Sequence, residues 1–490
     1  MSLFQEFQTL ETRRQFFSRG KNVLGYAALG SLLGSSMKLW GENAPAIHGA
    51  LPGLPHFPPK VKNIIYLHMV GGPSQMDLYD YKPQMKEWYD KDLPESVRAG
   101  QRLTTMTSGQ KRFPIAPSKY EFKQVGKCGL WMNEGLLPYT AKCVDDMAFI
   151  RSMHTEAINH EPAICHMQTG SMVSGRPCIG SWVSYGLGSM NQNLPTFVVL
   201  VAEPTNKEQI QAISARLWSS GFLSGEHAGV SFRSAGDPVL FISNPSGVPT
   251  ALRRKQLDGL RALNELNYKK IGDPETHTRI QQYEMAFKMQ SSVPDLMNVK
   301  GEPESTYKLY GEEAKKPGTF AFNALLSRRL VERGVRFVQM YLNNWDHHSN
   351  VNARLPSQCK DIDQATYGLI TDLKQRGLWD STLIVWGGEF GRTIYSQGGL
   401  SKDNYGRDHH PRCFTMWLAG GGIKGGTIYG TTDEFSYNIV ENPVHVRDLH
   451  ATILHQLGID HAKFTVKWQG ADMKLSGIDA SAQVVKAILS

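Results

Sequence analysis

The chain has 490 residues, which allows about three domains of ~150 residues or one large domain with insertions. Hydrophobic residues make up 41% and charged residues 20%, a balance that excludes a disordered chain. The net charge of +8 comes from scattered lysines and arginines rather than from one basic face or tail. We therefore predict no nucleic-acid partner.

The N-terminus has the pattern of a secretory leader. Arg13 and Arg14 precede two phenylalanines, an apolar stretch spans 23–33, and Ala44-Pro45-Ala46 suits cleavage by a signal peptidase. The arginine pair resembles a twin-arginine (Tat) signal, so we expect residues 1–46 to direct export through the Tat machinery. The alternative is an amphipathic N-terminal helix with a chance arginine pair.

The leader predicts a periplasmic or cell-surface protein. A helix needs ~20 apolar residues to cross a bilayer, and no segment approaches that length. We therefore expect no integral membrane segment in the mature chain.

After the leader, residues 47–60 are proline-rich and read as a linker. Short apolar runs ended by glycine or polar residues predict buried strands. In chain order, the expected strands are 61–70, 146–151, 195–201, 238–242, 335–342, 382–386 and 413–419. Helices are expected over 362–376 and 446–457, and a helical insertion over about 250–335.

Strands that alternate with helices predict an α/β domain over 61–490, with a mostly parallel central sheet and helices on both faces. Ligands of such sheets bind beyond the carboxyl ends of the strands. The six cysteines have no metal-binding spacing. Cys128 with Cys143, and Cys165 with Cys178, could form short disulfide loops, or all could be free thiols.

Four polar clusters follow the expected strands: 71–77 (GGPSQMD), 154–161 (HTEAINHE), 346–348 (DHH), and Glu389 together with 407–410 (RDHH). Imidazole and carboxylate groups suit zinc, iron or manganese better than calcium, which prefers oxygen ligands. We predict a divalent metal ion whose identity stays open among these four. The expected ligands are Asp77, Asp346, His348, Glu389, and His409 or His410.

Each cluster also has a structural interpretation. A histidine of 346–348 could cap a helix, and Glu389 could simply pair with Arg392 or Arg407. His160 could be a core histidine, and Asp77 could cap the helix that follows it. Since adjacent side chains often point apart, at most one of His409 and His410 is expected to bind a metal directly. His68 lies within an apolar strand and is expected to be a core residue.

Several motifs together resemble the bacterial DUF1501 family, over about residues 10–490: GGPSQMDLYDYKP, RSMHTEAINHEPA, WDHHSN, GEFGRT, GRDHHP and ENPVHVRDLHATILHQLGID. These exported proteins carry Tat-type leaders and are often labelled sulfatase-like. The resemblance implies an alkaline-phosphatase-like fold. It also implies metal-assisted displacement at phosphorus or sulfur.

Local comparison with sulfatases aligns 382–391 (TLIVWGGEFG) with a run that ends in a metal-binding Asp, and Glu389 stands at that position. His160 stands where sulfatases carry the nucleophilic Cys, so the formylglycine mechanism is not expected. Three alternatives follow: His160 as a metal ligand with metal-bound hydroxide as nucleophile, His160 itself as nucleophile, or Ser74. The first needs no unusual activation.

Two functions are compatible with these residues. The first is an exported metal-dependent hydrolase of sulfate or phosphate esters, in which Arg407 or Arg392 holds the anionic group. Its substrate would be an anionic small molecule or a sulfated polysaccharide. The second is a catalytically inactive fold that binds polysaccharide or acts as a scaffold.

Overall fold

The computed structural model describes residues 49–490 except 234–236, 240–241, 274 and 479–480. The leader therefore lies outside the described residues. One compact unit comprises Ile47–Ser243 and Glu284–Ser490, and a second unit contains Asn244–Tyr283. Among the described residues, no helix combines the length and apolarity that a membrane crossing requires.

A nine-stranded sheet forms the centre of the larger unit, in the order β12-β4-β11-β8-β1-β7-β5-β6, with β15 paired to β4. Its strands are β1 (Asn63–Met69), β4 (Met147–His154), β5 (Phe197–Ala202), β6 (Val230–Phe232), β7 (Phe337–Leu342), β8 (Thr382–Gly387), β11 (Phe414–Gly420), β12 (Thr427–Tyr429) and β15 (Val444–His445). All neighbours pair in parallel except β11, which is antiparallel to both β8 and β4. The predicted mostly parallel α/β fold is thus confirmed.

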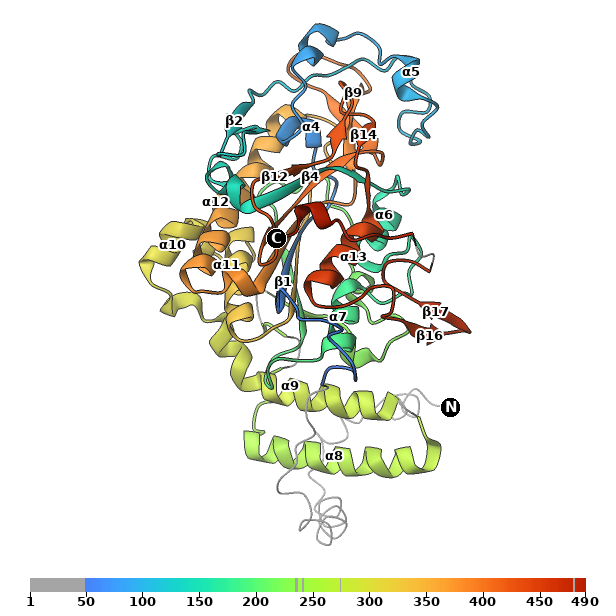
Figure 1. Cartoon of the computed structure of the whole chain (residues 1–490). Coiled ribbons are helices and arrows are strands. Elements are labelled where there is room, and N and C mark those ends of the chain that lie inside the picture. The colour runs from blue at the N-terminus through green and yellow to red at the C-terminus, as the bar shows by residue number, and fades with distance from the viewer. Residues whose placement is uncertain (1–48, 234–236, 240–241, 274, 479–480) are drawn as a thin grey trace, which may run out of the picture. The chain divides into compact units, whose positions relative to one another are not determined.

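Helices cover both faces of the sheet (Figure 1). The helices of the described residues are α4 (Gln75–Leu78), α5 (Glu95–Arg98), α6 (His160–Thr169), α7 (Ile179–Leu187), α8 (Thr250–Ile271), α9 (Glu275–Met297), α10 (Glu304–Tyr310), α11 (Phe320–Glu332), α12 (Val351–Gln375) and α13 (Val446–Gln456), of which α8 belongs to the second unit. Along β1, Ile65 and Leu67 pack in the cluster that contains α11 and α12, whereas Ile64 and Tyr66 pack with α7 and α13. This alternation is what a strand buried on both faces requires.

Three elements differ from the sequence prediction. The strand expected over 238–242 is absent at the described residues of that range, where 237–239 form a bend, and β6 is the edge strand instead. Helix α12 begins at Val351 rather than at Ile362, because Pro356 is accommodated inside it. The proline cannot donate to the carbonyl of Asn352, and that carbonyl accepts a hydrogen bond from the Tyr120 hydroxyl, 3.0 Å away.

The third difference is a two-stranded antiparallel sheet formed by β9 (Gly391–Gln397) and β10 (Gly406–His410), where loops were expected. The remaining short strands also form pairs: β2 (Lys123–Val125) with β3 (Leu130–Met132), β13 (Thr431–Thr432) with β14 (Ile439–Glu441), and β16 (Val466–Trp468) with β17 (Ala471–Met473). All six cysteines are free thiols, so neither disulfide loop forms.

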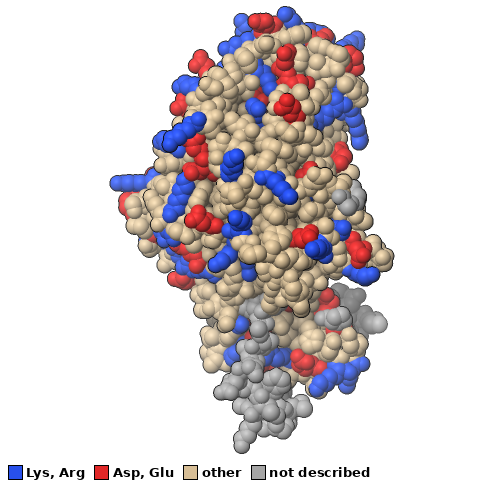
Figure 2. Space-filling view, viewed as in Figure 1, with Lys and Arg blue, Asp and Glu red and all other residues tan. Residues whose placement is uncertain are grey.

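On the face of the molecule shown in Figure 2, blue lysine and arginine side chains are interspersed with red aspartate and glutamate. No single-sign patch dominates this face. The distribution agrees with the scattered charges of the sequence.

Candidate metal centre at the strand ends

Four side chains from three separate segments converge beyond the carboxyl ends of the strands. His160 begins α6, Asp346 and His348 follow β7, and His409 lies on β10. One ligand atom from each residue lies within 4.8 Å of the other three. The group is nearly buried, with 11% of the His160 side chain and 13% of the His348 side chain exposed. Three of these residues, Asp346, His348 and His409, are among the predicted ligands. His160 was expected as a metal ligand in one of the three alternatives for the nucleophile.

Asp346 Oδ1 is the centre of the group. It lies 2.7 Å from His348 Nε2, 3.2 Å from His160 Nε2 and 3.5 Å from His409 Nε2. The two facing nitrogens of His348 and His409 are 3.0 Å apart. The other carboxylate oxygen, Oδ2, accepts a hydrogen bond of 2.8 Å from the Gln211 side chain, which orients the carboxylate.

The far nitrogens of the three histidines determine which atoms face this centre. Nδ1 of His409 lies 2.7 Å from the carbonyl oxygen of Ile158, which can only accept, so this nitrogen must carry the proton. Nδ1 of His348 lies 2.5 Å from Gln397 Oε1, and Nδ1 of His160 lies 2.7 Å from Glu389 Oε1. With Nδ1 of each ring occupied in this way, Nε2 of all three rings faces Asp346, where it can serve as a ligand atom.

This arrangement brings three imidazole nitrogens and a carboxylate oxygen together. His160 Nε2 has no hydrogen-bond partner among the described residues, although it is buried. Burial lowers the pKa of His409 to about 4, which keeps its ring neutral at neutral pH. Burial would also lower the pKa of His160, but Asp346 and Glu389 outweigh burial and raise this pKa. A cation between these residues would take the place of the His160 Nε2 proton, and three imidazoles with one carboxylate fit a transition ion.

Glu389 lies behind His160 rather than in the group. Its Oε1 accepts hydrogen bonds from His160 Nδ1 and from the Gly71 backbone, at 2.7 and 2.9 Å, and His68 Nε2 is 3.5 Å from Oε2. Burial would raise the pKa of Glu389, but His160 and His68 outweigh burial and lower this pKa to about 2. Glu389 is thus an ionised acceptor that sets the tautomer of His160. The sequence interpretation expected Glu389 to bind the metal directly. His68 is a fully buried residue of β1, as expected.

Gly71 is required where β1 ends. Its φ is +120°, and a Cβ there would lie 2.4 Å from the amide nitrogen of Asp346. Only glycine allows the backbone at position 71 to lie this close to the backbone of Asp346. The same conformation lets the Gly71 amide donate to Glu389.

Asp77 and His410 do not join the group. Asp77 accepts hydrogen bonds from Arg407, at 2.8 and 3.2 Å, and from the Ser74 hydroxyl at 2.6 Å. Both nitrogens of His410 are already paired, Nε2 with the Tyr437 carbonyl at 2.7 Å and Nδ1 with the Gln101 amide at 3.1 Å. Neighbouring residues of β10 point to opposite sides, so only His409 can reach the centre.

The two arginines expected to hold an anion are occupied. Arg407 is fully buried, and its five donors serve Asp77 twice and the carbonyls of Thr393, Ile394 and Ala116. Arg392 is also fully buried; it donates to Asp346 and to the carbonyls of Gly71, Gly72 and Arg407. Both arginines are therefore positioning residues. Ser74 is 1% exposed and its hydroxyl is bonded to Asp77, so it has no access to a substrate.

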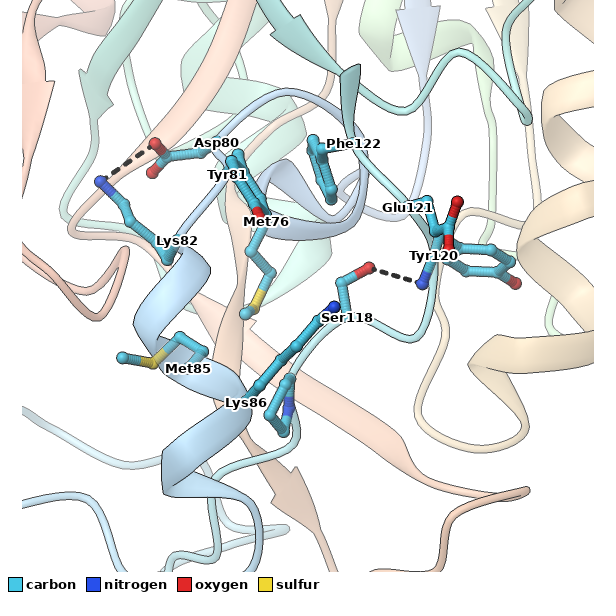
Figure 3. Close-up of a pocket in the computed structure, with 11 residues that line it drawn as sticks. Met76, Asp80, Tyr81, Lys82, Met85, Lys86, Ser118, Tyr120, Glu121 and Phe122 are labelled. Atoms are coloured by element: carbon cyan, nitrogen blue, oxygen red, sulfur yellow. Dashed lines mark hydrogen bonds and ion pairs between the residues drawn. The ribbon is translucent and has the colours of Figure 1, made fainter. Parts of the chain in front are cut away.

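Two features of the site carried no signal in the sequence: the acceptors Gln397 and Ile158, and the donor Gln211. An open cleft of about 400 Å³ begins at His348 and is lined further by Ser349, Gln397, Gly399, Leu400, Ser401, Asn404, Tyr405 and Gly406. A different pocket, of about 190 Å³, contains Asp80, Lys82 and Lys86 (Figure 3). Its lining residues share none with the four-residue group, and Lys82 there pairs with Asp80 at 3.2 Å.

The fold and the site define an α/β protein with a candidate transition-metal centre at the carboxyl ends of its central strands. The chain belongs to the DUF1501 family, described as a protein of unknown function, whose model matches residues 61–489. None of the curated proteins matches this chain.

Solved structures similar to this chain come from bacterial phosphatases and related hydrolases. An alkaline phosphatase superfamily protein from Vibrio parahaemolyticus is 11% identical, with a TM-score of 0.34 over 89% of this chain and 76% of that one. A phosphonate monoester hydrolase from Silicibacter pomeroyi is 12% identical, with a TM-score of 0.28 over 72% and 71%. The alkaline phosphatase of the Antarctic bacterium TAB5 is 11% identical, with a TM-score of 0.27 over 76% and 95%.

Proposed function

We propose that this chain is a metal-dependent hydrolase of sulfate or phosphate esters. The observation that carries the proposal is the convergence of three imidazole Nε2 atoms on Asp346 Oδ1, at the edge of the sheet where α/β enzymes bind ligands. Three imidazoles and one carboxylate suit a transition ion. His160, Asp346, His348 and His409 would hold the ion. When bound, it would supply a Lewis acid that polarises the ester and lowers the pKa of water.

The chain's own residues prepare this centre. Arg392 and Gln211 fix the carboxylate of Asp346, while Glu389, Gln397 and the Ile158 carbonyl fix the three rings. Because these contacts exist before any ligand binds, the donors need little reorganisation.

The cleft at His348 supports an ester carried by a sugar. Its lining includes hydroxyl and amide side chains, such as Ser401, Asn404 and Gln397, which suit the hydroxyl groups of a saccharide. Arg392 and Arg407 are already paired, so recognition of the anionic ester group is left to the bound ion rather than to an arginine.

The test is to measure the metal content and the ester hydrolysis of one preparation, made in a host that exports the protein. We expect about one equivalent of zinc, iron or manganese bound by the four residues, and turnover of aryl sulfate or aryl phosphate esters. Asp346→Asn with His348→Ala should remove the equivalent held by these four residues, and the turnover with it. The matched control is Glu161→Gln, an exposed carboxylate beside His160 that pairs with Arg216.

Turnover that survives the double variant would contradict the proposed centre. Stable metal binding with polysaccharide retention and no turnover on either ester class would favour the binding or scaffold role instead.

We further propose that the protein is exported to the periplasm or cell surface by the Tat machinery, on the basis of Arg13, Arg14 and the leader pattern of residues 1–46. Replacing both arginines by lysine should retain the protein in the cytoplasm, as measured by cell fractionation. Unchanged export of this variant would contradict a Tat signal.

A further inference from the structure

A second group of metal-ligand side chains lies outside the centre described above. Glu156 is in the loop that follows β4, His166 is on α6, and His445 immediately precedes α13. One ligand atom of each lies within 4.8 Å of the other two. None of the three residues belongs to the Asp346 group or supplies one of its acceptors.

The geometry is that of a half-open site. His445 Nε2 lies 2.9 and 3.1 Å from the two oxygens of Glu156, and His166 Nδ1 lies 3.6 Å from Glu156 Oε2. His166 is 1% exposed, whereas 56% of the Glu156 side chain is exposed. The group thus has a rigid buried side and a side open to solvent.

Two imidazoles and one carboxylate form a ligand set that zinc uses when it keeps one position for a solvent molecule. The nitrogen ligands disfavour calcium and magnesium, which take oxygen. His166 Nδ1 lies 3.3 Å from the Thr155 hydroxyl, its hydrogen-bond partner, and 3.6 Å from the Glu156 carboxylate, which is too far for a hydrogen bond. An ion between the ring and Glu156 would replace the hydroxyl as the partner of Nδ1.

His445 already has a structural role at the start of α13. Its Nδ1 accepts from the Arg447 amide, and its own amide donates to Asp448 in a capping box. Binding an ion through Nε2 moves the ring proton to Nδ1, so the Arg447 amide loses that acceptor while the contact with Asp448 remains. The hydrogen bond from the Arg447 amide to His445 Nδ1 is thus replaced by a bond between the ion and His445 Nε2.

We propose that Glu156, His166 and His445 form a second, peripheral site for a zinc-type divalent ion. The ion would tie the loop between β4 and α6 to the start of α13. That loop also carries Ile158, whose carbonyl fixes the tautomer of His409, so an ion here would hold an acceptor of the main centre in place. The proposal goes beyond the proposed function and does not depend on catalysis.

The experiment counts zinc equivalents on the purified protein after chelator treatment, addition of Zn²⁺ and dialysis. Wild type should retain two. Glu156→Gln with His445→Asn should retain one, and asparagine is chosen because it caps helices well and preserves the start of α13. Asp346→Asn with His348→Ala should also retain one. Loss of both equivalents from the variant that combines all four changes would complete the assignment.

Two outcomes would overturn the second site. One is an equal zinc count for wild type and the Glu156→Gln, His445→Asn variant. The other is a single equivalent in wild type that disappears with Asp346→Asn and His348→Ala. If the double change impairs folding, as judged by the metal-free melting temperature, Glu156→Gln alone replaces it, because this side chain is largely exposed. Glu161→Gln serves as its matched control.

Discussion

Three different acceptors give the same ring orientation to the histidines of the centre: a carboxylate for His160, a side-chain amide for His348 and a backbone carbonyl for His409. Each acceptor takes the Nδ1 proton and leaves Nε2 free. The carboxylate differs from the other two because its charge also increases the basicity of the ring. Glu389 should therefore contribute more to metal affinity than its distance from the centre implies.

Replacing Glu389 by Gln tests this contribution. The amide oxygen can still accept from His160 and Gly71, but the negative charge is lost. We expect zinc affinity to fall by about 10- to 100-fold, measured by competition with a chromophoric chelator. Glu161→Gln removes a neighbouring exposed charge and should leave the affinity unchanged. An unaltered affinity in Glu389→Gln would show that this carboxylate does not tune the ligand.

At the scale of elements, periodicity predicted the central strands because strands buried on both faces are continuous apolar runs. It also placed the segments 154–161 and 346–348 directly after strands, and polar residues that follow parallel strands meet at one edge of the sheet. It missed β9 and β10, whose buried residues are polar or charged and give no apolar signal.

The assignment of individual residues depended on pairings that sequence does not encode locally. Asp77 is 330 positions from Arg407 in the chain, and the two side chains form a hydrogen-bonded ion pair. Because each is occupied by the other, Asp77 does not bind the metal and Arg407 does not bind the anionic group, contrary to the sequence prediction. His409 and His410 could be separated only once β10 was known to be a strand, because alternation directs them to opposite sides. Long-range pairing, rather than residue type, decided these roles.

At the scale of the whole molecule, the candidate centre joins segments that are far apart in the chain. Its ligands come from α6, from the loop after β7 and from β10. An ion bound there would stabilise the folded state alone, because the unfolded chain does not hold these groups together.

Removing the metal should therefore lower the melting temperature of the wild-type protein. An ion present at ~100 times its dissociation constant stabilises the folded state by about 2.7 kcal/mol, which corresponds to a shift of at least about 3 °C. Differential scanning calorimetry with and without a chelator measures this shift. In Asp346→Asn with His348→Ala the shift should shrink to the part contributed by Glu156, His166 and His445. A shift of the same size in that variant would place the stabilising ion elsewhere than at Asp346, since a bound ion stabilises only through the ligands that hold it.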